Sequence, residues 1–467
     1  MNVRLAAVAV LAALATGCGG GGGGGGSSSE AASMLPADTL AYVTIDTDAS
    51  SAQVSSALKI LDKFPIEARA EQQLRASLSQ NSVNLDALTK SAGSEVDFAV
   101  VMVNGKPSPV GFAKPSDEKT FDAQIDVGTG VHTTKDGWTV FADKQAALDA
   151  VTAKPASNLA DDPAYQAAAK TLPATGDAIA RFYASSVGAQ TALGAAKSNL
   201  GPTAGSLGSI TAAKWIAGAL TSQDGAFKLE VHAKAASTTS APASNALADQ
   251  IPAGAIVALS LNSGGAVVPA SAQQQLSALG QQLGIDLAAL VSALNGPVIA
   301  YVRPGIPLPE VTIAARPTEP QRAATAVGGL ISRFAKGVKA VPTPVDGGTL
   351  NKVDLGPVAL YYVVANGQLV VTDSANALAE LKGSVGRLSG DSVFKEAKDG
   401  AGMTDSGQGF LFLDIKDALP ALSGFAQLAN QTLPPAVENN LRPLRSLLLF
   451  GSRDGDLQSF VVYVKTS

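Results

Sequence analysis

Short runs of alternating apolar and polar residues recur along the chain, and two of them fill segments 41–46 and 257–262. A two-residue period predicts a strand with one buried face. Each predicted strand is followed by a segment with the period of an amphipathic helix. The first helical stripe consists of Val54, Leu58 and Leu61, and the second includes Leu276, Leu279, Leu283, Leu287, Leu290 and Val291.

Two pairs of apolar segments are separated by residues that favour tight turns. Segments 96–103 and 110–113 flank Asn104-Gly105, and segments 298–302 and 311–315 flank Pro304-Gly305. This arrangement predicts two β-hairpins. After each returning strand comes a hydroxyl residue, Ser116 or Thr318, which we expect to cap the next helix.

The same order of patterns occurs in the two halves of the chain. Three pairs of predicted sites are each 230 residues apart: the turns Asp136-Gly137 and Asn366-Gly367, the helix caps Asp143 and Asp373, and the turns Asp224-Gly225 and Asp454-Gly455. Insertions and deletions do not easily produce one constant separation. The sequence therefore predicts two homologous repeats.

Each repeat is predicted to be α+β, with a mainly antiparallel sheet of hairpins and helices packed on it. The first repeat spans residues 35–235 and the second spans 250–467. A linker rich in Ser, Thr, Pro and Ala joins them at residues 236–249. Two arrangements remain open at this point: separate domains, or one sheet shared by both repeats.

The N-terminus has the pattern of an export signal. Arg4 is followed by an apolar run at 5–15, which is too short to cross a bilayer as a helix. Thr16 and Gly17 then precede Cys18, the single cysteine of the chain, and this segment resembles the lipobox of bacterial lipoprotein precursors. The resemblance implies a signal peptide at residues 1–17 and a lipid on Cys18. An ordinary cleaved signal, with Cys18 incidental, is the alternative.

Residues 18–34 include eight consecutive glycines followed directly by three consecutive serines, a composition typical of a flexible tether. The protein is therefore expected outside the cytoplasm, anchored by lipid to the cell membrane or the outer membrane. No second apolar run of eighteen or more residues follows. We expect the lipid to be the only anchor.

Two further segments carry a family resemblance. Residues 35–43 read Leu-Pro-Ala-Asp-Thr-Leu-Ala-Tyr-Val, and segment 159–165 is followed by an apolar strand at 178–184. They resemble a duplicated family of exported bacterial proteins catalogued only as a domain of unknown function. The likeness spans most of residues 34–467, and it implies no activity and no site residues.

Composition excludes some functions. The precursor has a formal net charge of -5 and no cluster of Lys and Arg, so a nucleic-acid partner is not expected. A hydrophobic content of 46% is sufficient for folded cores. The lone thiol and two distant histidines show no metal-ligand spacing, and no phosphate-binding loop occurs. We therefore expect neither a metal nor a cofactor.

Candidate catalytic residues are few. Ser186 follows a predicted strand and precedes a helix, as a nucleophile does in hydrolases, but the glycine that normally lies two residues earlier is missing. A base would have to be His132 or His232, and His232 is expected on a solvated strand face. Ser56 and Lys59 fit a Ser-x-x-Lys pattern without its companion Lys-Thr-Gly. The simpler interpretation is that Ser186 caps a helix.

Three functions remain as hypotheses. The first is a non-catalytic protein that binds an envelope protein, peptide or lipid, or that organises the envelope. The second is a carrier of lipid or a small molecule, with apolar helices around a cavity. The third is a hydrolase acting on envelope material through Ser186 or through paired carboxylates. The sequence leaves the oligomeric state open.

Overall fold

The computed structural model describes residues 30–79, 82–128, 130–153, 155–192, 213–235, 245–262, 296–305, 308–335, 338–356, 358–404, 409–428 and 432–467. Several sequence predictions lie outside these residues: the signal peptide, Cys18, most of the tether, the helical stripe at 276–291 and the linker segment 236–244. No helix in the described ranges is long and apolar enough to cross a bilayer.

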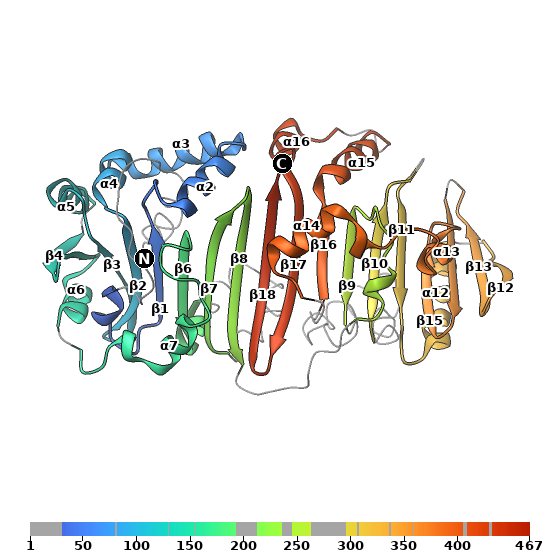
Figure 1. The fold of residues 1–467 in the computed structure, drawn as a ribbon, viewed down its shortest axis with the longest axis horizontal. Coiled ribbons are helices and arrows are strands. Elements are labelled where there is room, and N and C mark those ends of the chain that lie inside the picture. The colour runs from blue at the N-terminus through green and yellow to red at the C-terminus, as the bar shows by residue number, and fades with distance from the viewer. Residues whose placement is uncertain are drawn as a thin grey trace.

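The strands of the described chain form one antiparallel sheet of eighteen strands (Figure 1). The first half of the sheet runs, in spatial order, β4 (Val131–Lys135), β5 (Trp138–Ala142), β3 (Lys106–Ala113), β2 (Glu95–Val103), β1 (Ala41–Asp46), β6 (Ala180–Ser185), β7 (Ala213–Gln223) and β8 (Ala226–Ala235). The second half continues from β8 with β18 (Leu457–Thr466), β17 (Leu444–Asp454), β16 (Gly409–Asp414), β9 (Val257–Leu261), β10 (Val298–Arg303), β11 (Glu310–Ala315), β15 (Gln368–Thr372), β14 (Ala359–Ala365), β13 (Gly348–Asp354) and β12 (Val341–Val345).

The order of strands in the second half mirrors the order in the first. Each half closes with a hairpin, β7–β8 or β17–β18, and the last strands of the two hairpins pair with each other. The α+β class with a mainly antiparallel sheet is thus confirmed. The two halves share this one sheet through β8 and β18, which answers the question that the sequence left open.

One face of the sheet, the front face in Figure 1, carries two large apolar cores. In the first half α6 (Gln145–Thr152), α7 (Pro163–Ala169) and the 3-10 turns η1 (Glu30–Ser33) and η2 (Leu159–Asp161) cover buried side chains such as Tyr42, Phe112 and Trp138. In the second half α13 (Ala377–Leu381), α14 (Ser392–Ala401), η4 (Ala248–Gln250) and η5 (Leu388–Gly390) cover Tyr301, Phe412 and others.

The back face is covered by described helices chiefly near its two ends. At one end α4 (Leu85–Ser91) and α5 (Glu118–Val127) pack around Phe121 and Phe141, and at the other end α12 (Pro320–Phe334) packs on β14 and β15. The helices α2 (Ala52–Leu61), α3 (Ile66–Ser79), α15 (Ile415–Leu428) and α16 (Pro435–Leu441) lie along one edge of the molecule (Figure 1). In α2 the fully buried residues are Val54, Ala57 and Ile60, so Val54 is confirmed, whereas the predicted Leu58 and Leu61 are only partly buried.

Equivalent contacts recur in the two halves. The amide of Leu159 donates to the carbonyl of Leu35 at 2.8 Å, and the amide of Leu388 donates to the carbonyl of Ile251 at the same distance. The isolated bridges Pro36–Asn158 and Pro252–Arg387 flank these bonds. The recurrence supports the hypothesis of homologous repeats, which stays a prediction, as do the predicted domain boundaries.

The predicted tight turns are mostly confirmed. Asn104, Asp136, Asp224 and Asn366 all have positive φ angles and are each followed by a glycine in the same region, as a two-residue type I′ turn requires. The third predicted Asp-Gly turn, at Asp454-Gly455, is wrong by one residue. Asp454 still pairs with Leu457, so the turn is Gly455-Asp456, with glycine at its first position. The closing turns are consequently 231 residues apart, not 230.

The predicted helix caps are shifted. Asp117, not Ser116, caps α5, and the Ser116 hydroxyl donates instead to the carbonyl of Lys90 at 3.0 Å. Glu319, not Thr318, precedes α12, because Pro320 occupies the first helical position.

Asp143 and Asp373 do not cap helices either. The N-cap positions of α6 and α13 are Lys144 and Asn376, and the Asp373 carboxylate accepts a bond from the amide of Val311 at 2.7 Å. A bond to a neighbouring strand here replaces the cap that the sequence predicts.

Candidate functional site

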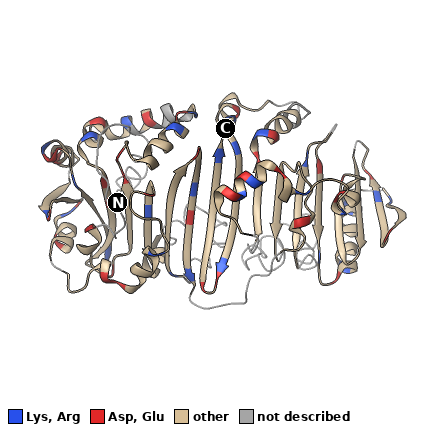
Figure 2. Ribbon diagram, in the orientation of Figure 1, with Lys and Arg blue, Asp and Glu red and all other residues tan. Residues whose placement is uncertain are grey.

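A stripe of polar side chains separates the two front-face cores at the middle of the sheet. Lys228, Glu230 and His232 alternate along β8, so all three point to the front face. Their neighbours on β18 across the halves are Tyr463, Val461 and Ser459. Charged residues are otherwise sparse on the strands of the sheet (Figure 2). The stripe therefore marks the junction of the two halves as a polar site inside an apolar surface.

Charged hydrogen bonds connect the side chains of the stripe with one another. The Glu230 carboxylate lies 3.0 Å from the Lys228 ammonium and 3.3 Å from Nε2 of His232. These two partners, His232 first, lower the pKa of Glu230 to about 2 although burial opposes the shift. On its other side, Nδ1 of His232 lies 2.8 Å from the Ser459 hydroxyl. Glu230 is thus held ionised and fixed in position.

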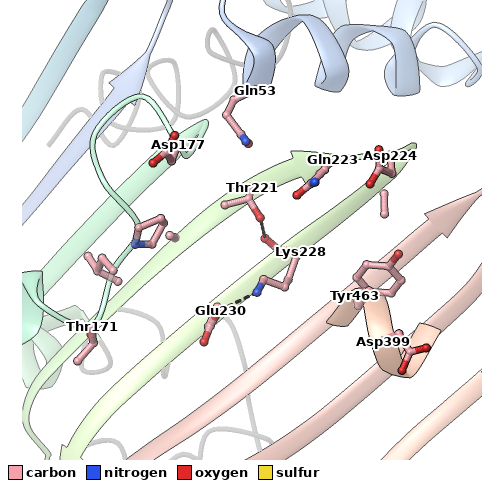
Figure 3. Close-up of a pocket in the computed structure, with 15 residues that line it drawn as sticks. Gln53, Thr171, Asp177, Thr221, Gln223, Asp224, Lys228, Glu230, Asp399 and Tyr463 are labelled. Atoms are coloured by element: carbon pink, nitrogen blue, oxygen red, sulfur yellow. Dashed lines mark hydrogen bonds and ion pairs between the residues drawn. The ribbon is translucent and has the colours of Figure 1, made fainter. Parts of the chain in front are cut away.

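A cavity of about 600 Å³ opens over this stripe (Figure 3). Its floor is formed by β7, β8 and β18, one wall by the segment after α7, and another by the end of α14. It is lined by Gln53, Thr171, Leu172, Pro173, Asp177, Ala219, Thr221, Gln223, Asp224, Ala226, Lys228, Glu230, Asp399, Gly400 and Tyr463. Both halves of the chain contribute to it. A volume of this size accommodates a small molecule.

The side chain of Tyr463 lines the cavity and is largely buried. Its side chain is 6% exposed, and no group in the described part of the chain forms a hydrogen bond with the hydroxyl. Burial raises the pKa of Tyr463, so the hydroxyl stays protonated and can donate as well as accept. A Cβ on Gly400 would lie 2.3 Å from this oxygen, so glycine at the end of α14 is needed to leave the hydroxyl its place.

Ser186 is not part of this cavity. It begins a helical segment at 186–192, directly after β6, and it is half-buried. The cap of that segment is its neighbour, since the Ser185 hydroxyl accepts from the amide of Gly188 at 3.2 Å. The ring of His132 contacts Asp122 and Asp126, and the ring of His232 contacts Glu230 and Ser459. Neither histidine therefore pairs with Ser186.

The contacts of Ser459, His232 and Glu230 have the connectivity of a hydrolytic triad, but the surroundings differ from those of a nucleophile. Ser459 lies inside β18, which pairs with β17 on one side and with β8 on the other. The ladder engages the backbone amides that would otherwise stabilise an oxyanion. Hydrogen bonding and packing between the halves account for this trio.

His232 corrects one sequence prediction. Its side chain is 7% exposed and lies on the covered front face, not on a solvated face. Among the described residues, no group of three or more His, Cys, Asp or Glu side chains is placed to hold a metal. Cys18, the predicted lipidation site, lies outside the described residues.

The sequence did not identify the cavity, because its lining residues come from six separate parts of the chain. Asp177 belongs to the first half, and the pairing of β8 with β18 brings it to the same cavity as Tyr463. Asp399 belongs to the second half and lies near Tyr463 because α14 packs on β18. The one available signal was the alternation Lys228, Glu230, His232, which is unusual in a chain with 16% charged residues.

Comparisons with known proteins give distant likenesses only. No family model matches the chain, and no curated protein does. Three crystal forms of TP0453 are similar in structure, with TM-scores of 0.27, 0.26 and 0.25 and identities of 14%, 15% and 12%. They cover 47%, 46% and 49% of this chain and 77%, 76% and 93% of TP0453. The resemblance to a duplicated exported family thus stays a prediction.

Proposed function

We propose that the protein is a non-catalytic binding protein of the bacterial cell envelope, exported and held to a membrane by lipid on Cys18. The single observation that carries the binding function is the cavity of about 600 Å³ at the junction of the halves. Its floor is rigid, because β7, β8 and β18 are interior strands and Glu230 is fixed by two partners. A site on rigid strands loses little free energy to ordering when a ligand binds.

The polar groups around the cavity favour recognition over chemistry. Glu230 has a strongly lowered pKa of about 2 and is already engaged by Lys228 and His232, so it is a poor general base near neutral pH. Ser186, the nucleophile of the hydrolase alternative, lies elsewhere and has no histidine partner. Fixed charges beside an open cavity instead suit the orientation of a polar ligand.

A lipid carrier is the second candidate, and the back face favours it. Leu229, Val462, Leu449, Leu411 and Leu259 lie side by side across five central strands and are all partly exposed. Phe460 on β18 is 45% exposed on the same face. No helix in the described ranges packs extensively on β8 or β18 from this side. An apolar surface of this extent is typical of a binding surface.

Native mass spectrometry of the protein purified from its own envelope tests the binding function. We expect a retained small molecule in the wild type. The variant Thr221→Trp should lose it, because indole would fill the floor of the cavity. Leu411→Trp on the back face is the matched control and should retain the molecule. If only Leu411→Trp loses a bound molecule, and that molecule is a lipid, the lipid-carrier hypothesis on the back face replaces the proposal that the cavity binds the ligand. A bare mass from all three proteins counts against both.

Metabolic labelling with a fatty acid tests the anchor. Wild-type protein should incorporate label and sediment with membranes. Cys18→Ser should incorporate none, because serine has no thiol to acylate. Labelling of Cys18→Ser, or membrane association unchanged by this substitution, would contradict the proposed anchor.

A further inference from the structure

We infer that the junction cavity binds a small organic polycation, such as a diamine or triamine. The inference rests on the proposed binding function and names the ligand class of the same site. The observations that carry it are the excess of carboxylates around the cavity and the free hydroxyl of Tyr463 inside it.

The charge of the cavity lining is strongly negative. Four carboxylates, on Asp177, Asp224, Glu230 and Asp399, face one ammonium, on Lys228. Lys228 is paired with Glu230 at 3.0 Å, so its charge is already compensated. Another cation, Lys465 on β18, donates to the backbone carbonyl of Asp224 at 2.5 Å and approaches Glu396 at 3.5 Å.

The other three carboxylates lie on the rim of the cavity. Asp177, Asp224 and Asp399 have no side-chain partner among the described residues. They come from the segment after α7, the β7–β8 turn and the last turn of α14, so they surround the opening from different sides. Such a rim attracts a cation and repels an anion.

Tyr463 gives the floor a group that a cation can use. Its side chain is buried to more than nine-tenths, its hydroxyl is unpaired, and its ring lies beside the end of α14 (Figure 3). The hydroxyl oxygen accepts N–H bonds and the ring face attracts ammonium groups. The C-terminal end of α14, at Asp399 and Gly400, adds the negative end of a helix dipole.

The cavity lining also contains apolar residues among its charged groups, which suits an amine that carries several ammonium groups on an apolar chain. Ala219, Leu172 and Pro173 are apolar and line the same cavity, and Ala219 is the cross-strand neighbour of Glu230. Methylene segments can pack there while ammonium groups reach the carboxylates. A bare divalent ion fits less well, because no metal-binding group was found among the described residues.

Calorimetric titration of the purified protein with spermidine at low salt tests the inference. We expect binding, and we expect the affinity to fall several-fold when salt is raised to about 0.5 M, because salt screens exposed charges. Triethylene glycol, a neutral chain of similar length, should not bind. Asp224→Asn should weaken spermidine binding about threefold and the triple variant D177N/D224N/D399N about tenfold or more. Tyr463→Phe should also weaken spermidine binding, although this substitution leaves the charge of the cavity unchanged.

The chain offers a matched control for Asp224. Asp136 occupies the same position of the same kind of Asp-Gly turn, with φ of 50° against 52°, but it lies in the β4–β5 hairpin. Asp136→Asn should bind spermidine as the wild type does. Equal loss in D136N and D224N, binding of triethylene glycol as tight as that of spermidine, or no binding of spermidine at millimolar concentration would overturn the inference. If spermidine fails but a retained molecule is lost from Thr221→Trp, only the ligand class is wrong and the proposed function stands.

Discussion

Lys234, near the end of β8, donates a hydrogen bond to the carboxylate of Asp456 in the closing turn of the second half at 2.6 Å. The counterpart contact runs the other way: Lys465 of β18 reaches the carbonyl of Asp224 in the closing turn of the first half at 2.5 Å. Backbone bonds accompany both, from Ala235 to Asp456 at 2.8 Å and from Thr466 to Gly225 at 2.9 Å. A lysine and a backbone bond thus join the halves at each end of this strand pair, although Lys234 bonds to a carboxylate and Lys465 to a backbone carbonyl.

Because β8 and β18 are interior strands, proline should not be tolerated there. Val231→Pro removes a ladder hydrogen bond between the halves and should lower the free energy of unfolding by about 3 kcal/mol. Val341→Pro is the control, since β12 is an edge strand that already contains Pro342 and Pro344. Thermal unfolding measures both. Equal stability of the two variants would contradict the shared sheet.

Helix capping gives a second prediction. The Asp162 carboxylate accepts from the amide of Tyr165 at 2.8 Å and caps α7, so Asp162→Ala should cost about 1 kcal/mol. Asp143 lies just before α6 but makes no cap, so Asp143→Ala should change stability by less than about 0.5 kcal/mol. Chemical denaturation distinguishes them. A larger loss for D143A than for D162A would restore the cap predicted from the sequence.

These caps show which parts of the fold could be predicted from sequence. The strands and tight turns were predictable, because alternation and Asn-Gly or Asp-Gly pairs act locally. Caps failed where a local pattern had several possible partners: Asp373 bonds to Val311 on a neighbouring strand instead of its own helix. The Gly455-Asp456 turn was missed because a type II′ turn shifts the glycine by one position.

The site was not predictable for a different reason. The contact of His232 with Ser459 and the position of Tyr463 beside Lys228 depend on the pairing of β8 with β18, which are more than 220 residues apart. Periodicity cannot reveal a pairing at that separation. It also placed the polar stripe of β8 on a solvated face, since alternating charges usually face water.

Backbone contacts beside two glycines give a third prediction. Gly93 has φ of +87°, and a Cβ there would lie 2.0 Å from the carbonyl oxygen of Lys114; at Gly296 the values are +112° and 2.3 Å from that of Arg316. Gly93→Ala should therefore cost about 2–4 kcal/mol. Gly105→Ala, with φ of +73° and open space around it, should cost only about 1 kcal/mol. If Gly93→Ala and Gly105→Ala lowered the free energy of unfolding by similar amounts, the chain near Lys114 would be able to move and make room for the added Cβ.

Glu230 makes the free energy of unfolding depend on pH in the acidic range. Its pKa is lowered from an ordinary 4.5 to about 2, mainly by His232 and also by Lys228. Because the pKa is lowered on folding, the ionised carboxylate stabilises the fold at pH values above its ordinary pKa. This contribution is lost as pH falls from about 4.5 towards 2. After allowance for solvent screening, the loss should amount to about 1–2 kcal/mol.

Glu230→Gln removes the titrating group, so this part of the acid dependence should disappear. The variant should be less stable than the wild type at pH 6, and the difference should shrink as pH falls to about 2.5. Asp136→Asn, at an exposed turn, should follow the wild-type curve throughout. Denaturation midpoints at four or five pH values measure this. A constant difference between Glu230→Gln and wild type would show that the carboxylate acts through packing and not through its charge, since only the charge is lost on protonation.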